Sequence, residues 1–177
     1  YGLWLDWMAQ GARVSSNLFY DNSWYDLFTE VQHGPIIVDN NILLSQSSVQ
    51  ENADGIAYVH NLFAGCFRGM DDERYVPYHL NHSTEIKGFK SIVHGDHRFY
   101  NNIFMGGKDT KAQYGLKGYQ TASWPIFAEG NLFCNNAQPA KEGQGEVLSV
   151  TVPEIQIEET ANEVYLILPD ETNHLSE

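Results

Sequence analysis

Apolar and polar residues alternate in two short segments near the start of the chain. In residues 3–7 and 27–31, apolar residues fall on one set of alternate positions. Side chains two positions apart point to the same face of a β-strand, so this pattern predicts two strands that each bury one face. The opposite face then carries one acidic residue per strand, Asp6 and Glu30, at positions 24 apart.

A motif of asparagine followed by two apolar residues recurs along the chain. Its five copies begin at Asn17, Asn41, Asn61, Asn102 and Asn131, at intervals of 24, 20, 41 and 29 residues. Repeats of this length, with short β-rich stretches and no helical periodicity, are typical of a parallel β-helix. Asn at the bend between two strands can adopt a left-handed conformation and hydrogen-bond to the Asn of the next turn. We therefore predict a structural asparagine ladder.

The chain divides into two parts where the asparagine repeat gives way to simple alternation of apolar and polar residues. We predict that residues 1–145 form parallel β-helix turns that carry the active site. From residue 146 on, three stretches alternate apolar and polar residues, with a turn at 160–162: 147–152, 154–158 and 163–168. Strands with one wet face are typical of an antiparallel sheet. We expect residues 146–177 to be the truncated start of a β-sandwich, in a chain that is all-β.

Two stretches depart from the repeat. Residues 68–90 are rich in charge, Tyr and His, and residues 106–123 are rich in Gly, Lys and Tyr. Insertions in a solenoid leave from one side and often build its binding face. Both stretches are therefore expected to wall a cleft.

Composition excludes several classes of partner. The formal net charge of −13 argues against nucleic acid, whose binding needs clustered Lys and Arg, whereas a neutral sugar tolerates it. No apolar run approaches the ~18 residues that a membrane span needs. Cys66 and Cys134 lie too far apart to predict a zinc site or a disulfide framework. We expect neither a nucleic-acid nor a membrane partner.

The first residues already follow a strand pattern and do not resemble a signal peptide. The chain opens at Tyr1 without an initiator Met, and a solenoid normally has a cap over its end. We therefore expect a fragment of a larger protein. A cytoplasmic location is slightly favoured, and the larger protein is a candidate homo-oligomer.

Asp6 and Glu30 are the strongest candidates for chemistry. If the two strands stack, their spacing of about 4.8 Å is close to the roughly 5 to 5.5 Å between the two carboxyl groups of retaining glycosidases. Two neighbouring carboxylates repel each other, and this repulsion raises the pKa of one of them. One acid then holds a proton while the other stays ionised. The aromatic residues Trp4, Trp7 and Phe28 flank the pair and could stack on a pyranose ring. The alternative is that both acids are ordinary solvated residues.

Three further residues are candidate substrate ligands. His33 follows Glu30 into a tight turn, where it could bind a sugar hydroxyl, tune Glu30 or satisfy loop carbonyls. His82 and Glu85 lie in a polar stretch in which His, His and Glu recur at three-residue intervals, from position 79 to 85. That spacing matches no metal motif, so we expect no metal and assign His82 and Glu85 to contact with substrate.

Several segments resemble the β-xylosidases of glycoside hydrolase family 120. The most specific similarity lies in the first forty residues, and the resemblance extends to about Phe133. The segments that carry it are 2–11, 17–22, 26–31, 33–35, 38–42, 57–62, 77–79, 82–85 and 98–104.

The resemblance implies a right-handed parallel β-helix, followed by an immunoglobulin-like sandwich. By the family's mechanism, Asp6 is the nucleophile and Glu30 the acid/base in the release of terminal β-D-xylose from xylo-oligosaccharides, with retained configuration. No cofactor is implied. The family's earlier turns supply further substrate contacts, so the piece alone is not expected to be active.

Two other functions stay open. A β-helix polysaccharide lyase would need a calcium-binding carboxylate cluster and an Arg or Lys base, but Arg13, Arg68, Arg74 and Arg98 are dispersed in the sequence. A non-catalytic carbohydrate-binding solenoid would need only the aromatic face.

Overall fold

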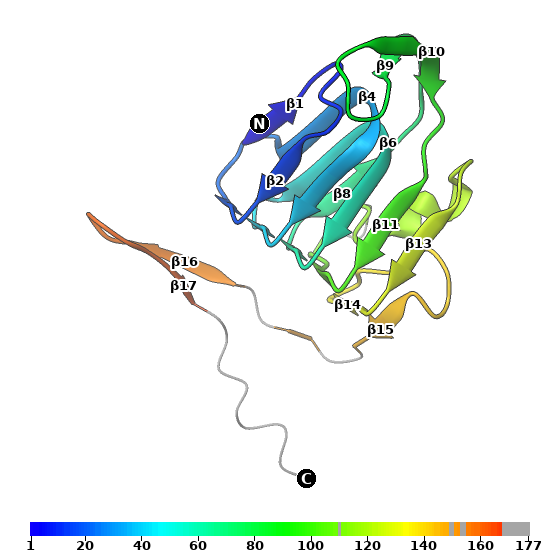
Figure 1. Ribbon diagram of the computed structural model, residues 1–177. Coiled ribbons are helices and arrows are strands. Elements are labelled where there is room, and N and C mark those ends of the chain that lie inside the picture. The colour runs from blue at the N-terminus through cyan, green and yellow to red at the C-terminus, as the bar shows by residue number, and fades with distance from the viewer. Residues whose placement is uncertain (110, 149–150, 153–154, 168–177) are drawn as a thin grey trace.

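The computed structural model describes residues 1–109, 111–148, 151–152 and 155–167. Within this part of the chain the regular secondary structure is β-strand, apart from one short 3₁₀-helix (Figure 1). A seven-stranded sheet contains β1 (Leu3–Leu5), β2 (Arg13–Ser15), β4 (Tyr25–Asp39), β6 (Ser47–Val59), β8 (Cys66–Gly69), β11 (His97–Tyr100) and β13 (Ile126–Glu129). A six-stranded sheet contains β3 (Leu18–Phe19), β5 (Ile42–Leu43), β7 (Leu62–Phe63), β12 (Ile103–Met105), β14 (Asn131–Cys134) and β15 (Gly145–Val147).

The chain passes back and forth between these two sheets. β4, β6, β11 and β13 of the first sheet are followed in sequence by β5, β7, β12 and β14 of the second. Every strand pair in the two sheets is parallel. This all-β arrangement with parallel sheets is consistent with the predicted β-helix.

β4 and β6 are long because each covers two faces of the molecule. The first part of β4 pairs with β1 and its last part with β2, while β6 pairs with β8 and then with β11. The bend in β4 includes Val31, whose φ is +40°. Gly34 lies just beyond, and a Cβ there would be 2.1 Å from the Gly55 carbonyl oxygen, so the two strands approach this closely only with glycine.

The interior is filled by stacked side chains from successive turns. Tyr58 and Phe99 stack with ring centroids 5.1 Å apart, and Phe104 stacks on both Phe63 and Phe133 at the same distance. All five side chains are fully or almost fully buried. Burial of apolar area in this column stabilises the stacking of the strands.

The asparagine ladder is confirmed. Each ladder Asn donates from its side chain to the next one, from Asn17 to Asn41 at 2.9 Å and from Asn41 to Asn61, Asn61 to Asn102 and Asn102 to Asn131 at 3.0 Å each. The left-handed residue is the one before each ladder Asn and not the Asn itself. These residues, Ser16, Asn40, His60, Asn101 and Gly130, have φ between 54° and 66°.

One of the two expected cleft walls is present. β9 (Asp72–His79) and β10 (Ile86–Ile92) form an antiparallel hairpin that leaves the repeat and contacts β4. The second stretch fits the expectation only in part. Within 106–123, which includes the 3₁₀-helix η1 (Lys117–Thr121), Tyr114, Leu116 and Tyr119 lie in the hydrophobic core, while residues 111–113 border a smaller cavity of about 340 Å³.

The tail departs from the expected boundary. β15 pairs in parallel with β14, so residues 145–147 still belong to the parallel sheet. β16 (Gln156–Glu159) and β17 (Val164–Ile167) form an antiparallel hairpin around the expected turn. The expected strand over 147–152 is not seen at 148 and 151–152, and residues 149–150, 153–154 and 168–177 of the predicted sandwich lie outside the described residues. Among the described residues, no helix is long and apolar enough to cross a membrane.

Candidate active site

Strand register brings Asp6 and Glu30 to neighbouring positions. β1 pairs with β4 through Leu5 and Thr29, and each acid directly follows its member of this pair. Leu5 packs against the core and Thr29 is fully buried, which turns the two acids outward. Adjacent strands are about 4.8 Å apart. Two carboxyl groups of successive turns therefore share one outer wall.

The two acids have different surroundings. Asp6 is exposed, and its Oδ1 accepts the N–H of Trp7 at 2.8 Å. Glu30 is mostly buried, and its Oε1 accepts from Arg74 Nη2 at 2.9 Å. One carboxyl group is thus solvated, while the other is oriented by a guanidinium.

Arg74 belongs to a small polar network above Glu30. Its guanidinium donates to both oxygens of Asp72, at 2.9 and 2.8 Å. These hydrogen bonds lower the pKa of Asp72 to about 2 and raise the pKa of Arg74. Asn52 is in register with Glu30 on the next turn, and its amide lies 3.5 Å from Asp72. The hairpin thereby closes over one side of the acid pair.

The predicted aromatic platform is only partly available. Phe28 stacks against Trp4 at 5.7 Å and against Tyr1 at 5.1 Å, and these rings leave it only 5% exposed. Trp4 and Trp7 are 50% and 53% exposed. Phe28 therefore supports Trp4, and the rings free to meet a sugar beside the acids are the two tryptophans.

The His33 ring is held by contacts with neighbouring strands. Its ring is buried, Nε2 donates to the Lys90 carbonyl at 3.2 Å, and Nδ1 lies 3.7 Å from Asp54 Oδ2. His33 therefore joins β4 to β10 and satisfies a carbonyl, which is the structural alternative considered above.

The structure does not bring His82 and Glu85 to Glu30. Both are exposed in the turn between β9 and β10. Arg74, near the other end of β9, contacts Glu30, and the five steps along the strand from Arg74 to His79 span about 17 Å. The turn is therefore far along the hairpin from the site of the acid pair.

Sequence reasoning missed the partners of Glu30. Arg74 lies 44 positions from Glu30, and no local pattern connects them. The only signal was the charge-rich stretch from 68 to 90, expected to wall a cleft.

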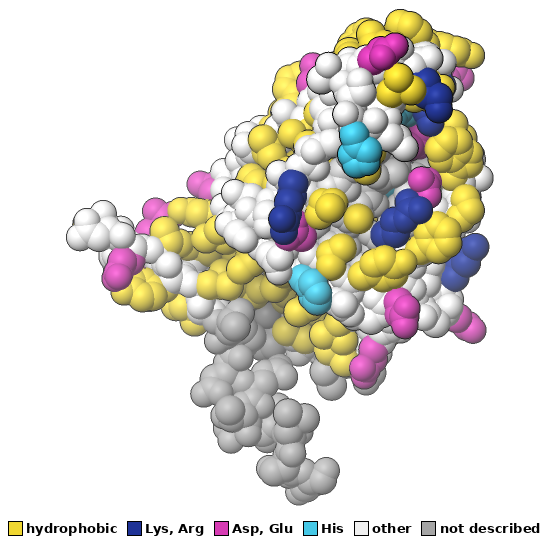
Figure 2. All heavy atoms as spheres, viewed as in Figure 1, with side chains coloured by type: hydrophobic (Ala, Val, Ile, Leu, Met, Phe, Trp, Pro, Cys, Tyr) yellow, Lys and Arg dark blue, Asp and Glu magenta, His cyan; other side chains and the backbone are white. Residues whose placement is uncertain are grey.

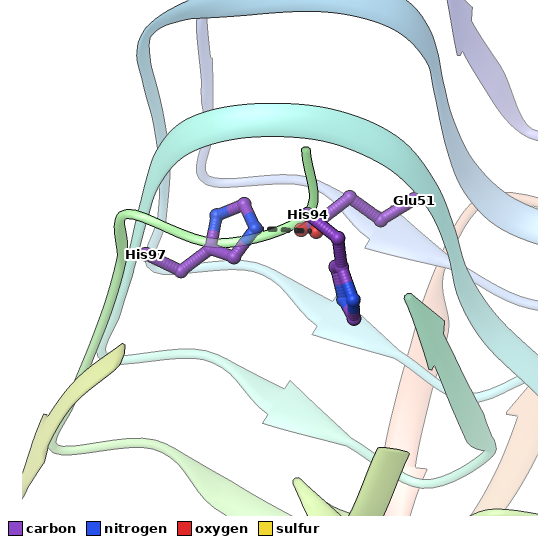
Figure 3. Close-up of side chains that lie close together, drawn as sticks. All are labelled: Glu51, His94 and His97. Carbon is purple, nitrogen blue, oxygen red and sulfur yellow. Dashed lines mark ion pairs between the residues drawn. The ribbon is translucent and has the colours of Figure 1, made fainter. Parts of the chain in front are cut away.

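A second cluster of ionisable residues lies inside the molecule (Figure 3). Figure 3 shows the Glu51 carboxylate and the His97 ring pointing toward each other, with His94 beside them. Glu51 Oε1 and His97 Nε2 are 2.8 Å apart and both side chains are fully buried. Tyr58 donates to the other Glu51 oxygen at 2.6 Å, and burial raises the pKa of Tyr58 well above its ordinary value.

The ligand atoms of Glu51, His94 and His97 lie within 4.8 Å of one another, as in a metal site. However, His97 Nδ1 accepts the N–H of Ile56 at 3.3 Å. A neutral imidazole that accepts at Nδ1 carries its proton on Nε2, whereas a metal-bound Nε2 requires a free lone pair. Burial lowers the pKa of His94 and so keeps its ring neutral, as a metal ligand would also need. The hydrogen bond at His97 Nδ1 is thus the one feature that favours a buried Glu51–His97 contact over metal ligation.

Comparison with known proteins gives one informative match. No family model matches the chain, and no curated protein sequence does. A solved structure of XylC in complex with xylose superposes with a TM-score of 0.86 and is 37% identical in sequence. The match covers 95% of this chain but 30% of the XylC chain, so this chain spans less than a third of that protein.

Proposed function

We propose that this chain carries the catalytic acids of a retaining glycoside hydrolase that releases terminal β-D-xylose from xylo-oligosaccharides. The observation that carries the proposal is the register of β1 and β4, which sets Asp6 and Glu30 side by side on an outer wall. The likeness to the xylose complex of XylC supports xylose as the sugar. The finer fold we infer is a right-handed parallel β-helix of the family 120 type, followed by an immunoglobulin-like domain.

In this mechanism Asp6 attacks the anomeric carbon while Glu30 protonates the departing glycosidic oxygen. A covalent xylosyl-Asp6 ester forms, and the aglycone leaves as an alcohol. Glu30 then removes a proton from water, which attacks the same carbon and releases xylose with retained configuration. Arg74 orients the Glu30 carboxyl group, and Trp4 and Trp7 offer rings on which the sugar can stack.

The test is hydrolysis of a chromogenic aryl β-xyloside by the purified full-length protein that contains this chain. Asp6→Asn removes the nucleophile and Glu30→Gln removes the acid/base, which contributes about 10²- to 10⁴-fold, so both variants should lose turnover by at least that factor. Asp109→Asn and Glu129→Gln are matched controls. Asp109 is also an exposed acid that accepts a backbone N–H, and Glu129 is an exposed residue of β13.

The stereochemistry of azide rescue separates the two roles. An Asp6→Gly variant rescued by azide should give the α-xylosyl azide, because azide replaces the nucleophile and attacks once. A Glu30→Ala variant should give the β-xylosyl azide, because azide attacks the covalent intermediate. Full activity in both acid variants would refute the assignment. Release of unsaturated uronate from pectin or alginate would indicate a lyase instead.

A further inference from the structure

A cavity of about 540 Å³ lies between the β9–β10 hairpin and the outer face of β4, β6 and β11. Figure 1 shows these strands side by side on the face below the hairpin. Ile37, Ala57 and Arg98 are in register on the three strands and border the cavity. Tyr78 and Lys90 border it from the hairpin. The volume falls within the range of small-molecule sites.

This cavity differs from the site at Asp6 and Glu30. Glu30 pairs in the first part of β4, before the bend, and Ile37 lies in the part of β4 that pairs with β2. The hairpin contacts Glu30 through Arg74, but Arg74 is absent from the lining of the cavity. The two sites therefore lie along different parts of β4, one before its bend and one after it.

Basic side chains outnumber acidic ones in the cavity, although the protein as a whole is strongly acidic. Lys87, Lys90 and Arg98 line it together with Asp54 and Asp96, whereas the whole chain has 10 Lys and Arg against 23 Asp and Glu. Arg98 is paired with Asp96 at 2.7 Å. No ion pair to Lys87 or Lys90 occurs among the described residues. Figure 2 shows Lys and Arg side chains lying among hydrophobic ones on the viewed face. An anionic ligand would complete this charge pattern.

Aromatic rings hold the ammonium group of Lys90 in place. Its Nζ lies 5.2 Å from the centroid of the Tyr78 ring and 4.9 Å from that of Trp124. These contacts position the charge without neutralising it. The same two rings border the cavity and offer apolar surface on which a sugar ring can lie.

A buried acceptor completes the lining. Asp54 is 2% exposed, and its Oδ2 accepts the N–H of Val93 at 3.2 Å. Its Oδ1 has no hydrogen-bond partner. An unpaired buried carboxylate oxygen is costly, and a ligand hydroxyl is a suitable donor for it.

We propose that this cavity binds a hexuronic acid unit, a pyranose that bears a carboxylate. Lys90, assisted by Lys87, binds the carboxylate, Tyr78 and Trp124 contact the ring, and Asp54 accepts a hydroxyl. Cations and aromatic rings in one cavity favour this ligand over two others. A neutral sugar would leave the lysines without an ion pair, and inorganic phosphate would make no contact with the faces of the rings. The inference does not depend on the proposed hydrolase activity.

Calorimetric titration of the purified protein with three probes tests the proposal. D-glucuronate should bind at least about tenfold more tightly than D-glucose, which has the ring without the charge, because hydrogen bonds to charged groups are the strong ones. It should also bind more tightly than inorganic phosphate, which has the charge without the ring. Equal affinity for glucose or for phosphate would overturn the assignment, as would no binding of glucuronate.

Variants locate the site. Lys90→Met should weaken glucuronate binding about tenfold or more, and Lys90→Arg should retain most of it. Both leave the main-chain carbonyl that His33 binds. Lys117→Met, on the exposed side of η1, is the matched control and should bind as the native protein does. Native-like binding by Lys90→Met would refute the site, and circular dichroism verifies that each variant is folded. Asp6→Asn should bind glucuronate normally, which separates this proposal from the hydrolase proposal.

Discussion

At the scale of single residues, the geometry of the candidate site depends on ion pairs between one arginine and two carboxylates. Arg74 joins Asp72 to Glu30 and so connects the hairpin to the outer wall that carries Asp6 and Glu30. Its side chain is half exposed, so the pair contributes less than about 1 kcal/mol to stability. Its main role is to orient Glu30, because two charged partners hold the guanidinium in place.

Replacement of Arg74 should change how stability depends on pH. The pKa of Asp72 is lowered to about 2 by Arg74, so the stabilising contribution is complete above the ordinary Asp value and is lost as pH falls through about 2. In Arg74→Met the pKa of Asp72 should rise toward its ordinary value. Urea unfolding should then show native protein more stable than Arg74→Met at pH 6, with a smaller difference near pH 2.

Arg68→Met is the control for loss of an exposed arginine from a neighbouring strand. It should show a difference from the native protein that does not vary over the same pH range. A difference between native protein and Arg74→Met that stays constant from pH 6 to pH 2 would contradict the role given to the Asp72–Arg74 pair.

At the scale of elements, the asparagine ladder holds one turn to the next. In its middle, Asn61 donates to Val38 and Asn102 and accepts both the backbone N–H and the side-chain amide of Asn41. At its end, Asn17 is exposed and has fewer partners. The same residue type therefore has unequal importance along the ladder.

We expect Asn61→Ala to lower the free energy of unfolding by about 2 to 4 kcal/mol, because it leaves several buried polar groups without partners. Asn17→Ala should lower it by less than about 1 kcal/mol, since water can replace the lost partners. Chemical denaturation of the two variants measures this gradient. Equal losses of unfolding free energy in the two variants would contradict this gradient, because they would mean that each Asn contributes the same amount regardless of its burial and its partners.

At the scale of the whole molecule, the stacked interior restricts access to one of the two cysteines. Cys134 in β14 is 2% exposed, whereas Cys66 in β8 is partly exposed, and both thiols are free. Burial raises the pKa of the Cys134 thiol, which lowers the fraction of reactive thiolate.

Labelling with a thiol reagent should therefore proceed in two phases. Cys66 reacts first, and Cys134 reacts only as fast as the parallel stack opens. In Cys66→Ser the fast phase should disappear, and urea should accelerate the phase that remains. Rapid labelling of Cys134 in native buffer would show that β14 opens independently of the rest.

Local patterns in the sequence determined much of the fold. Alternation in residues 3–7 and 27–31 indicated the paired strands and the outward acids, because the side-chain period of two is a property of each strand alone. The recurring Asn motif indicated the parallel turns and the ladder, since each turn of a parallel β-helix returns the motif to the same corner even when the turns differ in length. The antiparallel hairpin at 156–167 also followed from local alternation.

Only the tertiary structure decided which distant residues meet. Arg74 reaches Glu30 because a hairpin inserted between two turns folds back over β4. Glu51 and His97 meet because both side chains point into the interior, although His97 lies beside Ile56 and Glu51 lies five residues earlier on β6. Lys90, Trp124 and Asp54 surround one cavity although they come from three separate segments. Such contacts depend on the direction of excursions and on packing, which sequence spacing does not encode.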